Sequence, residues 1–206
     1  MILAVTNYDA ATASNFAVCA VLFPLSITSL LGPQAVRTVL QDALAAQPTA
    51  PVLLFGHGAA DMFIGNDGAG AIRLQDAALF SNRATFAFAC STAAALGPAI
   101  TQSGGVWVGF KSEIFCLISD PSFRDIFEQV PQYAHQNIGN IVDETSAQDF
   151  IGDFVKLTHQ LEAQVDDTGV GDMESYRALR SYRQKVQCRH LQAHNNMDLQ
   201  QTLPSR

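Results

Sequence analysis

The sequence predicts an α/β fold with a mostly parallel central sheet and helices on both of its faces. Short, continuous apolar runs occur at 51–55, 84–89 and 106–110. Strands of a parallel sheet are buried on both faces, so they consist of continuous hydrophobic residues instead of alternating apolar and polar ones. Segments with helical spacing separate these runs, and strands that alternate with helices are typical of α/β proteins.

The N-terminal half contains the predicted strands and their first connections. The apolar run at 1–5 predicts a buried strand, whereas the run at 16–25 fits either a strand or a helix. An amphipathic helix is predicted over 36–44, where apolar residues recur at the i, i+3, i+4, i+7 and i+8 positions. The segment 59–72 is polar and glycine-rich, which predicts a hairpin or a loop, and a short helix is expected at 74–80.

The C-terminal half is predicted to be mostly helical. A helix is expected over 93–103, and amphipathic helical patterns cover 121–161 with a break near 138–140. The acidic segment 162–172 contains glycines and predicts an exposed loop. Apolar residues at helical spacing then predict a closing helix over 173–195.

Composition and charge narrow the classes of function. A net charge of −7 and a pI near 5.0 argue against general nucleic-acid binding, which favours basic surfaces. Four widely spaced cysteines form no CxxC pair, and the N-terminus lacks the pattern of a signal peptide. No apolar run is long enough to span a bilayer. We therefore expect a protein of the reducing cytoplasm that does not bind membranes.

Two of the predicted strands end in reactive residues. His57 stands between two glycines after the run at 51–55, and Cys90 directly follows the run at 84–89. Open α/β sheets place their sites at the carboxyl ends of parallel strands. The 32 residues between His57 and Cys90 are enough for one crossover connection, which needs about a dozen or more. Both side chains are therefore expected at the same edge of the sheet.

A histidine beside a cysteine is the arrangement needed for nucleophilic catalysis by a thiolate. A free thiol has a pKa of about 8.5, so a positively charged partner favours its ionisation at neutral pH. Gly58 leaves room for a substrate, and its backbone N–H together with that of Cys90 is expected to bind an oxyanion. A helix that begins just after Cys90 would add the positive end of its dipole. These features predict acyl transfer.

A strand that ends in His-Gly, followed by a later strand that ends in Ala-Cys, resembles the caspase-like cysteine peptidases. This group includes caspases, metacaspases, gingipains, separase and bacterial CHAT-domain proteases. The matching positions are His57-Gly58 and Ala89-Cys90, and Ser91 suits the small residue that follows the cysteine. The caspase pentapeptide is absent, as is the acidic residue that metacaspases carry before the cysteine. The chain is therefore most similar to the CHAT-domain proteases.

This resemblance covers roughly residues 1–120 and implies a three-layer, caspase-like sandwich. It implies a single peptidase domain over 1–206, with the catalytic core in 1–120 and a mostly helical C-terminal part in 121–206. The implied function is that of a cysteine endopeptidase without cofactor or metal, in which Cys90 attacks a peptide carbonyl and His57 protonates the leaving amine. The implied partners are a protein or peptide substrate and a regulatory protein, as in bacterial stress or anti-phage systems.

Further residues near the site are candidates for binding the substrate. The resemblance implies that the segment after the run at 106–110 lies near the S1 pocket. Acidic residues in the loop after His57 are candidates for orienting the imidazole or shaping S1, although such residues are usually solvated. The candidates are Asp61, Asp67, Lys111, Ser112 and Glu113. The remaining cysteines, Cys19, Cys116 and Cys188, are expected to be structural.

Other interpretations remain open. Cys90 taken alone fits a small buried hydrophobic residue. The chain is alternatively a catalytically silent, caspase-like adaptor that binds a partner. A third alternative is a cysteine-dependent amidohydrolase of the amidotransferase or DJ-1 type. In those enzymes the histidine follows the cysteine along the chain, whereas here the candidate histidine precedes it.

Overall fold

A six-stranded sheet forms the centre of the computed structural model, which describes residues 1–25, 28–115, 121–167 and 173–190. Its strands are β1 (Ile2–Val5), β2 (Thr28–Leu31), β3 (Val52–Phe55), β7 (Ala84–Phe88), β8 (Val106–Phe110) and β9 (Val186–His190). They lie in the order β2-β1-β3-β7-β8-β9. The first five are parallel, and only β9 runs antiparallel to its neighbour β8. The predicted parallel α/β fold is confirmed.

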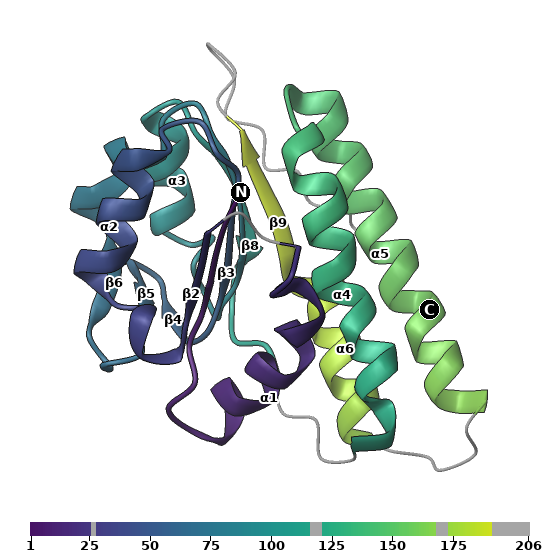
Figure 1. Cartoon of the computed structure of the whole chain (residues 1–206). Coiled ribbons are helices and arrows are strands. Elements are labelled where there is room, and N and C mark those ends of the chain that lie inside the picture. The colour runs from purple at the N-terminus through teal and green to yellow at the C-terminus, as the bar shows by residue number, and fades with distance from the viewer. Residues whose placement is uncertain (26–27, 116–120, 168–172, 191–206) are drawn as a thin grey trace.

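Helices cover both faces of this sheet, so the fold has three layers (Figure 1). One face carries α2 (Arg37–Ala46), η3 (Leu74–Phe80), α3 (Leu96–Gln102) and a small antiparallel sheet of β4 (Gly58–Ala59), β5 (Met62–Ile64) and β6 (Gly70–Arg73). The other face carries α1 (Ala10–Cys19), α4 (Arg124–Asn137), α5 (Glu144–Asp167) and α6 (Met173–Lys185). Short 3-10 turns lie at Ala20–Leu22, Gly32–Gln34, Pro121–Phe123 and Ile138–Asn140.

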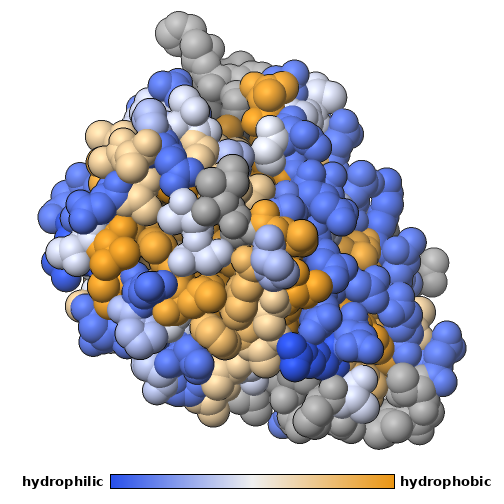
Figure 2. All heavy atoms as spheres, in the orientation of Figure 1, coloured by the Kyte–Doolittle hydropathy of each residue, from blue (hydrophilic) through white to orange (hydrophobic). Residues whose placement is uncertain are grey.

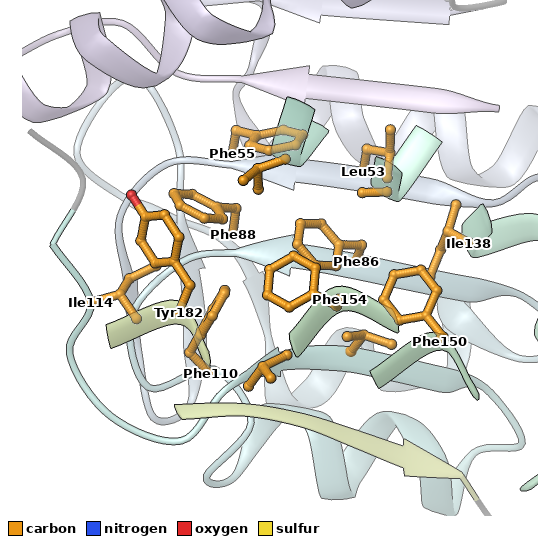
Figure 3. Packing of buried hydrophobic residues seen from close by; sticks show 14 of the residues in the cluster. Leu53, Phe55, Phe86, Phe88, Phe110, Ile114, Ile138, Phe150, Phe154 and Tyr182 are labelled. Carbon is orange, nitrogen blue, oxygen red and sulfur yellow. The ribbon is translucent and has the colours of Figure 1, made fainter. Parts of the chain in front are cut away.

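Alternate residues of each strand enter two separate cores, because successive side chains of a strand point to opposite faces. In β3, Leu53 and Phe55 face α1, α4, α5 and α6, whereas Val52 and Leu54 face α2, α3 and η3. The first core is rich in aromatic rings (Figure 3), and the rings of Phe88 and Tyr182 lie 4.8 Å apart in an edge-to-face contact. This contact joins the sheet directly to α6.

The second core is filled by smaller side chains around one tryptophan. Trp107 of β8 is fully buried and lies edge-on to Phe80 of η3, with 6.0 Å between the ring centroids. Ala87 and Ala89, which precede Cys90, belong to this core. Both cores therefore hold the end of β7 firmly in place.

Several sequence predictions need correction in the C-terminal part. The predicted loop at 162–172 is wrong up to Asp167, because α5 continues to that residue with Leu161 and Val165 fully buried at an i, i+4 spacing. Residues 168–172 lie outside the described part. The predicted helix over 173–195 ends at Lys185, where the chain becomes the antiparallel strand β9 and pairs with β8. Residues 191–195 are likewise outside the description.

The structure also settles the ambiguous N-terminal segment. Residues 16–25 belong to the end of α1 and to the 3-10 turn that follows it, so the helical alternative holds for most of this run. The edge strand β2 was not predicted, since its four residues show neither the helical spacing nor the alternation of a strand clearly.

The surface over α4 and α5 is mostly hydrophilic (Figure 2). Within the described part of the chain, no helix combines the length and apolar character needed to cross a membrane.

Candidate functional site

His57 and Cys90 leave neighbouring strands at the same level. The last paired residues of β3 and β7 are Phe55 and Phe88, and His57 and Cys90 each lie two residues beyond that pair. The Gly56 N–H still donates to the Phe88 carbonyl at 3.2 Å, so the strands stay together up to the site. His57 and Cys90 both line one open cleft of about 490 Å³. The structure thus brings the two predicted residues to one edge of the sheet.

Gly58 packs against the backbone of the cysteine. A Cβ atom at this position would lie 2.6 Å from the Cys90 carbonyl oxygen and 3.0 Å from the Ala89 Cβ. Real Cβ atoms essentially never approach other atoms to 2.6 Å, so only glycine fits without a shift of the backbone. The absence of a side chain at Gly58 therefore lets the segment that carries His57 lie directly against the segment that carries Cys90.

The chain turns sharply after Cys90. Ser91 has a φ of 60°, which lies in the left-handed region that residues other than glycine rarely adopt. Its N–H donates to the Ser112 carbonyl at 3.2 Å, which holds the strained residue in place. The helix predicted over 93–103 is present as α3, but this turn redirects the chain and α3 begins only at Leu96, so no helix starts directly behind Cys90. The end of a helix dipole is therefore not adjacent to the thiol.

The imidazole of His57 has an acidic partner that sequence reasoning missed. Nε2 of His57 lies 2.7 Å from Oδ2 of Asp9, and both side chains are partly exposed. Asp9 is the N-cap residue of α1, and its other oxygen, Oδ1, accepts the Thr12 N–H at 2.9 Å. The carboxylate is thus held by the helix end and in turn holds one nitrogen of the imidazole, which leaves Nδ1 for chemistry.

The environment of Asp9 favours its charged form. Partial burial works against ionisation, but hydrogen bonds from the Thr12 backbone and from His57 outweigh it and lower the pKa of Asp9 below its ordinary value. The Tyr8 ring lies 5.7 Å from the imidazole of His57. Burial and the nearby carboxylates of Asp9 and Asp67 raise the pKa of Tyr8, so its hydroxyl stays protonated. The imidazole therefore has an anionic carboxylate and a neutral phenol as neighbours.

The sulfur of Cys90 contacts the main chain that follows β8. Its Sγ accepts the Ile114 N–H at 3.3 Å and lies 3.6 Å from the Ile114 carbonyl oxygen, to which a thiol hydrogen can be donated. We call residues 111–115 the strap. Ile114 is buried against the aromatic core (Figure 3), whereas the neighbouring Phe115 is largely exposed. The strap therefore forms one wall of the cleft beside the thiol.

Of the residues predicted to bind the substrate, only one lines the cleft. Glu113 lines the cleft together with His57 and Cys90, whereas Asp61, Lys111 and Ser112 do not. Asp61 is exposed at the turn between β4 and β5, and Ser112 contributes its carbonyl to the turn after Cys90. No side-chain hydrogen bond joins Asp61 or Asp67 to His57 among the described contacts, since Asp67 caps its own turn at the Ala69 N–H.

Cys19 does not belong to the lining of this cleft. Cys19 is a free, buried thiol of α1, and burial raises its pKa well above the ordinary value. Cys188 lies on β9, and Cys116 is outside the described residues. In the described ranges, no three side chains of the His, Cys, Asp or Glu types come together as metal ligands.

Asp9 was detectable in principle from the sequence, although not as a partner of His57. An aspartate followed three residues later by Thr12 is a pattern that marks the start of a helix. Its proximity to His57, which is 48 residues away along the chain, depends on the pairing of β1 with β3. No protein-family model matches the chain, and no curated protein and no solved structure shows a significant match to it.

Proposed function

We propose that this protein is a cysteine endopeptidase that uses Cys90 as its nucleophile and His57 as its general base and acid. The observation that carries the proposal is the position of the two residues. They occupy equivalent places beyond the paired Phe55 and Phe88, and they border one open cleft. The histidine precedes the cysteine along the chain, as in the caspase-like peptidases, and this likeness further supports the assignment.

The reaction proceeds in two acyl-transfer steps. The Cys90 thiol gives its proton to Nδ1 of His57, and the sulfur attacks the peptide carbonyl to form a tetrahedral oxyanion. When the carbon–nitrogen bond breaks, His57 donates that proton to the leaving amine, and a thioester with Cys90 remains. His57 then takes a proton from water, whose oxygen attacks the thioester and releases the carboxylic acid and the free thiol. The N–H groups of Gly58 and Cys90 are the proposed donors to the oxyanion.

Asp9 acts through His57 in this scheme. Its carboxylate is 2.7 Å from Nε2 and stabilises the imidazolium that forms when His57 accepts a proton. The lowered pKa of Asp9 keeps this carboxylate ionised at neutral pH. We therefore describe Asp9 as a positioning residue that orients the ring and favours proton transfer.

The proposed substrate is a peptide segment of a specific protein target, because the cleft is open and its walls include the exposed Glu113. By likeness to the CHAT-domain proteases, we propose activation by a partner protein within a bacterial stress or anti-phage system. We also propose a cytoplasmic location, since the four widely spaced cysteines do not form the dense pattern of a secreted disulfide framework. Roles of Asp61, Lys111 and Ser112 in binding the substrate stay predictions.

A peptide-library cleavage assay with mass-spectrometric readout tests the proposed function. We expect the wild-type protein to cleave a subset of peptides, alone or with lysate of its host as a source of the activator, and the Cys90→Ala and His57→Ala variants to cleave none. His159→Ala, which removes an exposed histidine of α5, is the matched control and should retain wild-type cleavage. Cleavage that persists in Cys90→Ala, or wild-type protein without any cleavage under both conditions, would contradict the proposal.

Replacing Asp9 with asparagine should separate the role of its charge from its role as a helix cap. Asparagine caps a helix about as well as aspartate, so α1 should remain intact. We expect kcat to fall roughly tenfold or more, because the imidazolium loses its anionic partner. Thr12→Ala is the control, since it weakens the cap and leaves the contact with His57. Equal kcat values for Asp9→Asn and the wild type would show that the carboxylate does not serve catalysis.

The same variant should reveal the lowered pKa of Asp9 in the pH dependence of stability. A carboxyl group whose pKa is lower in the folded state stabilises that state above its ordinary pKa of 3.8, and this advantage disappears as the pH falls through the lower, folded value. The difference in thermal midpoint between the wild type and Asp9→Asn should therefore shrink as the pH falls below the ordinary carboxyl pKa. A difference that grows with acidification would be inconsistent with the assigned shift.

A further inference from the structure

The main chain on both sides of Ile114 links the sulfur of Cys90 to helix α6. The Glu113–Ile114 peptide group donates its N–H to Sγ of Cys90 at 3.3 Å, and its carbonyl oxygen accepts a hydrogen bond from Nζ of Lys185. The next peptide group has its carbonyl 3.6 Å from Sγ, and its N–H donates to Oγ of Ser181 at 3.3 Å. Each peptide group that touches the sulfur is thus anchored on its far side by a residue of α6.

The sheet determines where Lys185 lies. Lys185 is the last residue of α6, and β9 begins directly after it with Val186 opposite Phe110 of β8. The Lys111 N–H donates to the Lys185 carbonyl at 3.0 Å, which extends this pairing into the strap. The ammonium group therefore reaches the Glu113 carbonyl from a fixed position, although the two residues are 72 positions apart in the sequence.

A cation on the oxygen of a peptide group changes how the same group donates its N–H. Hydrogen bonds in a chain polarise one another, and bonds to charged groups are stronger than neutral ones. The ammonium of Lys185 draws electron density toward the Glu113 oxygen, which makes the Ile114 N–H a better donor. That N–H points at the sulfur of Cys90. Negative charge on the sulfur is therefore favoured by a cation that does not touch it.

We propose that Lys185 is a positioning residue for the nucleophile, which acts on Cys90 through the Glu113–Ile114 peptide group and stabilises negative charge on the sulfur. This inference rests on the proposed role of Cys90 as the nucleophile. It gives helix α6 a role in the chemistry. The sequence motifs around His57 and Cys90 contain no residue of that helix. No helix N-terminus lies directly behind the thiol, because α3 begins only at Leu96. The strap instead presents the polarised N–H of Ile114 to the sulfur.

The rate at which iodoacetamide alkylates Cys90 tests this role without any peptide substrate. Three variants separate charge from anchoring: Lys185→Arg keeps both, Lys185→Gln keeps a donor without charge, and Lys185→Met keeps neither. Arg180→Gln removes the same charge from an exposed position on the same helix and is the matched control. The rate is measured as loss of the unmodified Cys90 peptide by mass spectrometry, at temperatures well below each variant's thermal midpoint.

We expect Lys185→Gln and Lys185→Met to be alkylated roughly three- to tenfold more slowly than the wild type. Lys185→Arg should restore the rate to within about twofold, and Arg180→Gln should leave it unchanged. Wild-type rates in Lys185→Gln would overturn the role of the charge, and wild-type rates in Lys185→Met would overturn the role of the residue altogether. Equally slow alkylation of Arg180→Gln would attribute the effect to the general charge of α6 and also overturn the proposal.

The alkylation assay distinguishes failure of the role proposed for Lys185 from failure of the proposed peptidase function. Alkylation reports on the sulfur alone, so slow alkylation of Lys185→Met supports the link even if the peptide library is not cleaved. Conversely, a wild-type alkylation rate in Lys185→Met combined with peptide cleavage that depends on Cys90 would remove Lys185 from the mechanism and leave the peptidase assignment intact.

Discussion

Replacing Gly58 with alanine is expected to lower peptide cleavage about a hundredfold or more, because a misplacement of catalytic groups by about 1 Å has an effect of this size. The new Cβ would lie 2.6 Å from the Cys90 carbonyl oxygen and 2.7 Å from Cγ2 of Thr92. The first of these atoms belongs to the backbone and cannot rotate away. The segment that carries His57 must therefore move away from the segment that carries Cys90.

Kinetics and stability together check this expectation. The loss should appear mainly in kcat, since the reacting groups separate while the rest of the cleft remains. Gly139→Ala is the matched control, because the nearest atom to its new Cβ, a carbon of Pro51, would lie 3.5 Å away at an ordinary contact distance. A Gly58→Ala variant that keeps wild-type kcat would show that close packing of the two segments is not required for the reaction. Thermal midpoints identify any variant that has lost its fold.

Replacing Phe86 with alanine is expected to reduce the free energy of unfolding by about 3–5 kcal/mol, the range measured for buried phenylalanines. Phe86 is fully buried at the centre of β7, and its ring packs near the rings of Phe150 and Phe154 of α5 at 6.2 Å and 5.8 Å. Its removal would leave a cavity between the sheet and α5. A change of this size is a large part of the total stability of a typical domain.

Urea denaturation measures this loss. Phe115→Ala is the control for the residue type, because its ring is 56% exposed and its removal should change the unfolding free energy by less than about 0.5 kcal/mol. An effect of Phe86→Ala below about 1 kcal/mol would mean that the aromatic core rearranges to fill the space. Such a result would contradict the tight packing seen between β7 and α5 (Figure 3).

The strands and the two reactive residues were predictable because their signals are local. Continuous apolar runs of about five residues that are bounded by glycine or polar residues favour buried strands over helices. For that reason β3, β7 and β8 appeared at the predicted positions, and His57 and Cys90 followed directly from their ends. The general rule that parallel strands end at one edge of a sheet placed both residues at that edge, and the pairing of β3 with β7 in the structure makes them neighbours.

The C-terminal part was less predictable because its structure depends on distant partners. Residues 186–190 pair with β8 across about 80 positions of the sequence, and they extend the helical pattern of α6 without any local signal for a strand. The end of α5 was likewise misread, because its acidic residues suggested a loop while Leu161 and Val165 are buried against other elements. Burial by neighbours overrides local composition in both cases.

From the sequence alone, the α/β class, the strands β3, β7 and β8 and the positions of His57 and Cys90 at strand ends could be predicted, whereas the order of the strands in the sheet could not. The surroundings of these two residues depend on tertiary contacts: Asp9 binds the imidazole, Gly58 packs against the cysteine backbone, and the strap joins the thiol to Lys185. The physical reason is the range of the interactions. Hydrophobic periodicity acts over a few residues, whereas each of these contacts joins segments between 24 and 72 residues apart, or neighbouring strands that the chain must first assemble into a sheet.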